Sequence, residues 1–142
     1  MNPLSARGFL LYGGIILVVV AVGGYLGIIG PTSDKSLFGS LWFFTDLEND
    51  AHLLFGVVAL AAYFLLKDAS LTKWLVALVG VVAVLAVLIG LMVSGSAVPN
   101  ASLVGINGNL ENPMDTVLHV VVAVWAFWAA FMGAKKAVET AV

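Results

Sequence analysis

The chain has 142 residues and a net charge of −2; 62% of its residues are hydrophobic, 10% are charged, and its mean hydropathy is +1.11. This composition excludes a water-soluble globular domain and indicates an integral membrane protein. The absence of cysteine excludes disulfide bonds, thiolate metal sites and thiol redox chemistry.

Four apolar runs follow one another along the chain, at residues 9–29, 47–66, 74–94 and 114–133. Each can cross the hydrocarbon core as a helix, since about 20 apolar residues are enough. The first run is longer than the apolar segment of a signal peptide and no A-x-A cleavage site follows, so we expect it to be retained. We therefore predict an all-α, four-helix transmembrane bundle that forms a single membrane domain over residues 1–142.

The charged residues are distributed unevenly between the two sides of this predicted bundle. Five of the six basic residues fall on the side of the chain termini: Arg7, Lys67, Lys73, Lys135 and Lys136. The opposite side carries Lys35 and most of the acids: Asp34, Asp46, Glu48, Asp50, Glu111 and Asp115. The positive-inside rule then predicts that both termini are cytoplasmic, in what we interpret as a bacterial inner membrane.

Small and aromatic residues indicate where helices approach one another. Gly23 and Gly27 form a GxxxG pair that permits close contact between helix backbones. Trp125, Trp128 and Phe131 form a stripe at helical spacing in the last run, for which packing or lipid contact is a simpler explanation than cofactor stacking.

Two halves of the chain resemble each other. S-L-F-G at residues 36–39 recurs as S-L-V-G at residues 102–105, and each copy precedes a helix that carries an acid and a histidine in its first turns. The halves, roughly residues 8–70 and 71–137, have the same orientation. We therefore predict a tandem repeat of two helical hairpins, related by a pseudo-two-fold axis along the membrane normal.

The acids in these copies have an ordinary role at helix starts. Thr45 and Glu48 have the spacing of a capping box, in which each side chain bonds the backbone N–H of the other residue. Asn112 is expected to cap the last helix, with Pro113 at its first position and Asp115 at its third. Glu48 and Asp115 are therefore predicted to stabilise helix N-termini.

His52 and His119 each follow the corresponding acid by four residues, so each lies on the same helix face as its acid. Polar side chains at this depth are expected to face the bundle interior. One interpretation is a structural pair of hydrogen-bonded histidines. The second is a metal site formed by His52, His119, Glu48 and Asp115. In the third, His52 and His119 bind a haem or a chlorophyll-type pigment.

The two histidine segments also carry a family resemblance. Asn49, His52, Leu53 and Gly56 form an N-x-x-H-L-x-x-G pattern, and Asp115, Leu118 and His119 form a D-x-x-L-H pattern. With the glycine-rich first run, they resemble an uncharacterised family of small four-helix bacterial membrane proteins, over most of the chain. The resemblance implies a four-helix fold and both histidine positions, but no assigned activity.

Three functional classes can be compared on the sequence. The chain lacks a nucleophile with a base inside the membrane, so we expect no enzyme, and it has no charge at the membrane midplane that would indicate a transporter. A structural, accessory or assembly subunit with no cofactor needs only a stable bundle and an exposed loop. We expect contacts with lipid and with other membrane subunits or further copies, and none with nucleic acid. The loop after the first helix carries an apolar set: Leu37, Phe38, Leu41, Trp42, Phe43 and Phe44.

Overall fold

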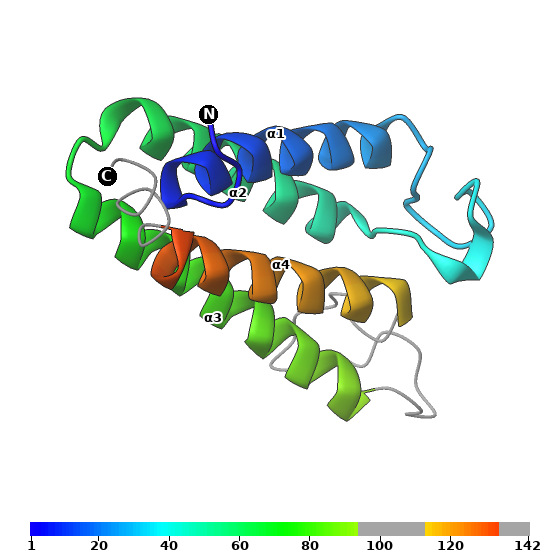
Figure 1. The fold of residues 1–142 in the computed structure, drawn as a ribbon. Helices are drawn as coiled ribbons and strands as arrows, with labels where there is room; N and C mark the ends of the chain where they lie inside the picture. Colours follow the sequence, from blue (N-terminus) through cyan, green and yellow to red (C-terminus); the bar gives the residue numbers. More distant parts are fainter. Residues whose placement is uncertain (94–112, 134–142) are drawn as a thin grey trace.

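The computed structural model describes residues 1–93 and 113–133, and this part of the chain is helical throughout its regular structure (Figure 1). The elements are α1 (Ala6–Tyr25), the 3-10 turn η1 (Gly39–Leu41), α2 (Asp46–Leu65), α3 (Ala69–Val93) and α4 (Pro113–Phe131). One α-helix coincides with each of the four predicted apolar runs. The prediction of an all-α fold is therefore confirmed.

Three of the helices, α1, α3 and α4, are long and apolar enough to cross a membrane. α2 also has 20 residues, but its first two turns carry the polar residues Asp46, Glu48, Asn49, Asp50 and His52. They lower the mean hydropathy of α2, so this helix does not belong to that group of three. The structure is consistent with a membrane protein, and a fourth crossing by α2 stays a prediction.

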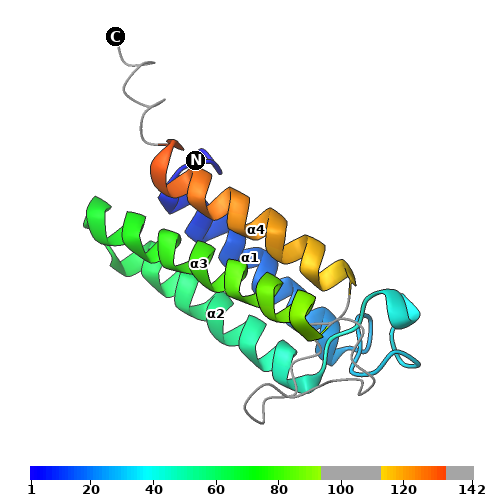
Figure 2. The same cartoon turned by 90° about the horizontal axis from the view of Figure 1, so that it is seen from below.

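The helices form two antiparallel hairpins, α1 with α2 and α3 with α4 (Figures 1 and 2). The hairpins meet mainly through α1, which contacts both α3 and α4. We call the end of the bundle with the starts of α1 and α3 the base, and the opposite end, where α2 and α4 begin, the head. The N-terminus and the last turn of α4 both lie at the base.

The first helix ends earlier than the sequence predicted, at Tyr25 rather than residue 29. Gly27 adopts a positive φ of 75°, which an L side chain rarely tolerates, and the N–H of Ile28 donates back to the Gly23 carbonyl at 2.9 Å. Gly23 and Gly27 therefore terminate α1. The prediction that they form a helix-packing GxxxG face was wrong.

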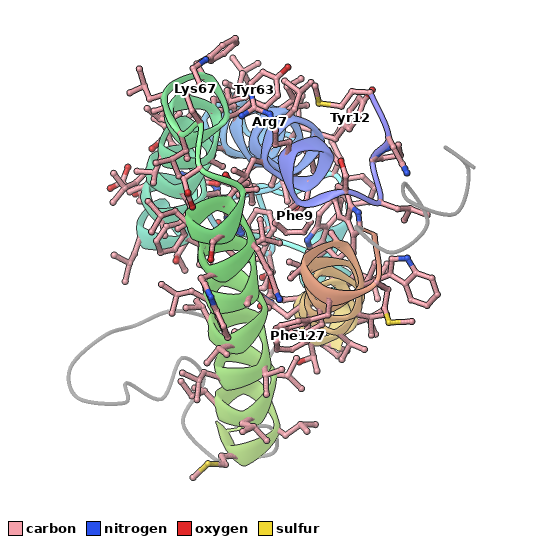
Figure 3. The ribbon with its side chains drawn as sticks, turned by 60° about the vertical axis from the view of Figure 1, so that its left-hand side comes forward. Arg7, Phe9, Tyr12, Tyr63, Lys67 and Phe127 are labelled. Carbon is pink, nitrogen blue, oxygen red and sulfur yellow. The ribbon has the colours of Figure 1, made fainter. Side chains whose placement is uncertain are left out.

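α1 and α2 instead approach each other closely at Gly14 and Gly56. A Cβ on Gly56 would lie 3.0 Å from the backbone nitrogen of Val18 and 3.1 Å from the Gly14 carbonyl oxygen. Such contacts leave no room for a side chain, so both backbones depend on glycine here. The N–H groups of Arg7 also join α1 to the last turn of α2, at the base (Figure 3).

The apolar core lies at the base, where α1, α3 and α4 converge. Its fully or almost fully buried members are Phe9, Leu10, Val76, Ala77, Ala126, Ala129 and Ala130. The alanines of α4 let its backbone approach α1 and α3, and the ring of Phe9 fills the space beside Trp125 with the two ring centroids 4.7 Å apart. Because lipid tails are as apolar as these residues, close van der Waals packing stabilises this region more than burial from water does.

In the aromatic stripe on α4, one side chain packs against α1 and the other two are partly exposed. Trp125 contacts Phe9 and donates from Nε1 to the carbonyl of Pro3 at 2.9 Å. Trp128 and Phe131 remain 40% and 39% exposed, and Phe131 also packs edge-on against Trp74. The stripe therefore combines helix packing with an exposed apolar surface, as the sequence predicted.

α3 begins five residues before the predicted run, at Ala69. The carboxylate of Asp68 accepts a hydrogen bond from the N–H of Leu71 at 2.7 Å and so provides the N-cap. This polar first turn extends the helix beyond the apolar segment from which the boundary was predicted.

Candidate functional site

The start of α2 has the predicted capping box. Thr45 N–H donates to Glu48 Oε2 at 2.7 Å, and the Glu48 N–H donates to Thr45 Oγ1 at 3.4 Å. Glu48 Oε1 takes no part in the box; it is buried and accepts no hydrogen bond. The cap therefore uses only one of the two carboxylate oxygens.

The start of α4 agrees in part with its prediction. The helix begins at Pro113, and Asp115 stands at the third position with 2% of its surface exposed. The predicted cap, Asn112, lies outside the described residues. Asp115 is thus a buried acid in the first turn of α4, as Glu48 is in α2.

His119 turns back along α4 toward this acid. Its Nδ1 lies 2.9 Å from the backbone oxygen of Asp115 and 3.1 Å from the carboxylate oxygen Oδ2. If Nδ1 carries the proton, it donates to the carbonyl and leaves the lone pair of Nε2 free, which is how ligating histidines are usually held. The predicted acid–histidine pairing on one helix face is present in α4.

His52 has a different environment. Its ring packs on Phe44, with ring centroids 4.7 Å apart. Its Nδ1 is buried and near the Glu48 carbonyl, but not in hydrogen-bonding geometry. The two histidines therefore occupy corresponding positions on their helices without having the same partners.

The acids and histidines of the two hairpins lie at the same end of the bundle, the head. Glu48 is close enough to interact electrostatically with Asp115 and His119, and His52 interacts with the same two residues. We call Glu48, His52, Asp115 and His119 the head cluster. All four side chains that the sequence singled out therefore lie at the head, in the first two turns of α2 and α4.

The described residues contain no group of three or more acids and histidines arranged to hold a metal ion. The set Glu48, His52, Asp115 and His119 therefore stays a prediction as a metal site. Haem or pigment binding by His52 and His119 likewise stays a prediction. The geometry itself shows two buried carboxylates and two partly buried imidazoles at the head of the bundle.

Asn49 is a buried polar residue that the sequence reasoning did not select as a site residue. Its side chain is fully buried, and neither amide atom makes a hydrogen bond. It lies directly against Gly24 of α1, where a Cβ would overlap the Asn49 amide. In the sequence, the one feature that pointed to Asn49 was its position in the N-x-x-H pattern. Asn49 is one residue after Glu48, so its side chain leaves α2 in a different direction and meets α1.

The loop from α1 to α2 is held to the head by backbone and side-chain bonds. Phe44 N–H donates to the Ile29 carbonyl at 2.6 Å. Ser36 Oγ accepts from the Phe38 N–H at 3.1 Å and donates to the Trp42 carbonyl at 2.6 Å. Ser36 begins the first S-L-x-G copy; the second copy, at residues 102–105, lies outside the described residues, so the predicted repeat is not tested.

The apolar set on this loop divides into two groups. Phe44 is 1% exposed, and Trp42 and Phe43 are half-buried. Leu37, Phe38 and Leu41 are 80%, 46% and 60% exposed, and we call these three residues the loop patch. The loop extends beyond the ends of α1 and α2 (Figure 1).

The head also carries exposed negative charge. A hydrogen bond from Thr32 holds the pKa of Asp34 in this loop below its ordinary value, so this carboxylate is ionised at neutral pH. Tyr25 donates a hydrogen bond from its hydroxyl to Asp50 at the junction of α1 and α2. Lys35 is the one lysine or arginine at the head among the described residues.

No protein-family model, curated protein or solved structure matches the chain. The resemblance to small four-helix bacterial membrane proteins therefore stays a prediction. Its two patterns fall on the residues described above, with Asn49 against α1 and His52 and His119 in the head cluster.

Proposed function

We propose that this chain is a four-span protein of a bacterial inner membrane and a structural, accessory or assembly subunit of a larger membrane complex. α2 packs along α1, which is apolar enough to span, and this supports a fourth crossing. In the proposed topology the base, with Arg7, Lys67 and Lys73, faces the cytoplasm, and the acidic head faces outward. Lys135, Lys136 and Glu111 lie outside the described residues.

This topology can be tested with single cysteines, because the natural chain has none. Lys35→Cys at the head and Lys67→Cys at the base both replace exposed lysines. In intact cells, a membrane-impermeant thiol reagent is expected to label position 35 and to reach position 67 only after the membrane is opened. The reverse pattern would contradict the proposed orientation.

The loop patch is the observation that carries the accessory role. Its three apolar side chains are exposed although hydrogen bonds and aromatic contacts hold the loop in place. An exposed apolar surface on an ordered segment is typical of an interaction site, because its burial against a partner removes it from water. A membrane subunit that docks on this patch would cover it.

The test is a triple substitution of Leu37, Phe38 and Leu41 by serine, with Leu65→Ser as the control at an exposed apolar position of the base. In a mild detergent, the unaltered chain and the control are expected to share one native mass, larger than that of the monomer. The triple variant is expected to run as a folded monomer. An unchanged native mass in the triple variant would contradict docking through the patch.

A second candidate function is metal, haem or pigment binding by His52 and His119. It is favoured by the presence of two imidazoles and two buried carboxylates at the same end of the bundle. The same purified protein is expected to show a visible absorption band or a stoichiometric metal if this candidate is right. His119→Gln should then remove the band or the metal, while a colourless, metal-free preparation would rule the candidate out.

A further inference from the structure

An apolar groove runs between α3 and α4 on an exposed side of this hairpin. It is lined by aliphatic side chains and one ring: Val84, Val87, Val120, Ala123, Val124 and Phe127. Its volume is about 240 Å³, many times the roughly 30 Å³ of a water molecule, and these side chains offer water no hydrogen bond. An apolar chain is therefore the occupant that fits the groove.

Aromatic rings continue this groove toward the base. The Phe127 ring packs on Gly80 of α3, where a Cβ would lie 3.1 Å from the ring, and it stacks on Phe131 with the ring centroids 6.4 Å apart. Figure 3 shows Phe127 between α3 and α4. Phe131 in turn packs edge-on against Trp74 of α3. At the base, the groove therefore ends beside two partly exposed aromatic rings.

Lys73 places a positive charge at this end of the groove. Its Nζ lies 4.9 Å from the centre of the Phe131 ring and 5.5 Å from that of Trp74, so cation–π contacts with both rings hold the ammonium in place. Lys73 also shares one face of α3 with Val84 and Val87, because a helix makes one turn in 3.6 residues. The cation and the groove are therefore parts of one continuous surface.

No acid neutralises this lysine in the part of the chain that the structure describes. The ion pair found there joins His119 to Asp115 at the head, the opposite end of the bundle. Asp68, the described acid nearest to Lys73 in the sequence, instead accepts a hydrogen bond from the N–H of Leu71 as the cap of α3. The surface thus combines an apolar groove with an ammonium that has no anionic partner among the described residues.

We infer that the α3–α4 groove binds an anionic phospholipid, with the lipid phosphate on Lys73 and one acyl chain along the groove. A lysine ammonium binds phosphate as a point charge, and basic sites between transmembrane helices suit anionic headgroups. The rise from Lys73 to Val87 is about 21 Å, enough to follow an acyl chain through one leaflet, which is half of a hydrocarbon core of about 30 Å. A free anion would use only the lysine, whereas a lipid uses the lysine and the groove.

This inference goes beyond the accessory role and rests only on the membrane location of α3 and α4, which are both long and apolar enough to span. The test compares phosphatidylglycerol with phosphatidylcholine that carries the same acyl chains. Each lipid is added in micelles to the full chain in a mild detergent. Phosphatidylglycerol is expected to raise the midpoint of thermal unfolding in a saturable way and to appear as one bound molecule per chain by native mass spectrometry. Equal effects of the zwitterionic lipid would overturn the inference.

Lys73→Gln locates the headgroup. It removes the charge but keeps a polar side chain, and it is expected to weaken phosphatidylglycerol binding about fivefold or more, the effect of one lysine at an anionic lipid surface. Lys67→Gln removes an exposed lysine at the same end, which lies over no aromatic ring in the described part of the chain, and should cause a clearly smaller loss. Equal losses would mean that only the general charge of the base attracts the lipid, and would contradict the assigned site.

Val84→Phe locates the acyl chain. The added ring fills the groove and is expected to weaken phosphatidylglycerol binding about as strongly as Lys73→Gln. Val82→Phe adds the same ring on the opposite side of α3, at an exposed residue outside the groove, and should leave binding unchanged. If Val84→Phe does not fold, Val124→Phe repeats the test from α4 at an exposed position of the groove. Equal effects of Val84→Phe and Val82→Phe would contradict an acyl chain in the groove.

Two other occupants would give different results. If the ligand is a free anion, inorganic phosphate at constant ionic strength should stabilise the chain through Lys73, and Val84→Phe should have no effect on this. If a second copy of the chain fills the groove, Val84→Phe should lower the native mass, and phosphatidylglycerol should not bind in a one-to-one ratio. Either result would overturn the lipid site.

Discussion

Gly14→Ala is expected to lower the free energy of unfolding by about 1–3 kcal/mol, the range for an added methyl group in a tightly packed interface. The new Cβ would lie 2.9 Å from Leu60 Cγ and 3.1 Å from the Gly56 carbonyl oxygen. The carbonyl belongs to the α2 backbone and cannot move aside alone, so α1 and α2 would have to shift apart by a few tenths of an ångström. Reversible unfolding in mixed micelles measures the effect.

Gly13→Ala is the matched control, one residue away on the same helix. A Cβ there would lie 3.8 Å from the Phe9 ring, an ordinary contact. Since alanine favours a helix over glycine by up to about 1 kcal/mol, this variant is expected to be neutral or slightly more stable. Equal destabilisation by the two alanines would show that Gly14 has no special role at the crossing.

Arg7→Ala is expected to cost about 2–3 kcal/mol of unfolding free energy, because hydrogen bonds from a charged group contribute about 1.5–3 kcal/mol each and these are partly buried. Arg7 donates from Nη1 to the Leu66 carbonyl at 2.7 Å and from Nη2 to the Tyr63 carbonyl at 2.8 Å. Its guanidinium carbon also lies 5.0 Å from the centre of the Tyr63 ring. The substitution leaves the last carbonyls of α2 without these donors.

Lys67→Ala, at an exposed cation of the same end, provides the control and is expected to change the unfolding free energy little. Arg7→Lys should fall between the two, since an ammonium keeps the charge but lacks the fork that reaches both carbonyls. Figure 3 shows Arg7, Tyr63 and Lys67 at the base. If Arg7→Ala and Lys67→Ala have the same effect, the cap at the end of α2 does not contribute as proposed.

Local patterns in the sequence predicted the features that depend on neighbours along the chain. Length and apolar composition predicted helices in each of the four runs, and the spacing of Thr45 and Glu48 predicted the capping box. The same patterns placed two helix ends wrongly, because each of these ends depends on a single residue outside the apolar pattern. The end of α1 depends on the positive φ of Gly27 and the start of α3 on the cap from Asp68, so both boundaries moved away from the apolar runs.

The sequence also selected the four ionisable residues of the head cluster, because acids four residues before histidines share a helix face. It did not reveal that one oxygen of Glu48 lacks a donor, since that depends on the tertiary packing around the side chain. Asn49 is a similar case. Its burial follows from the rotation of α2, which packs the Asn49 amide against Gly24 of α1.

The sequence by itself therefore determined the all-helical class, the apolar helices long enough to cross a membrane, the local cap at the start of α2 and the candidate polar residues, because each depends on composition or on spacing within one turn or two. Only the tertiary structure decided that Gly14 and Gly56, rather than Gly23 and Gly27, bring two helices together. It also decided which loop side chains are exposed. Apolar residues surround these helices on most faces, so the hydrophobic pattern does not specify their rotation, and contacts between distant segments select one packing.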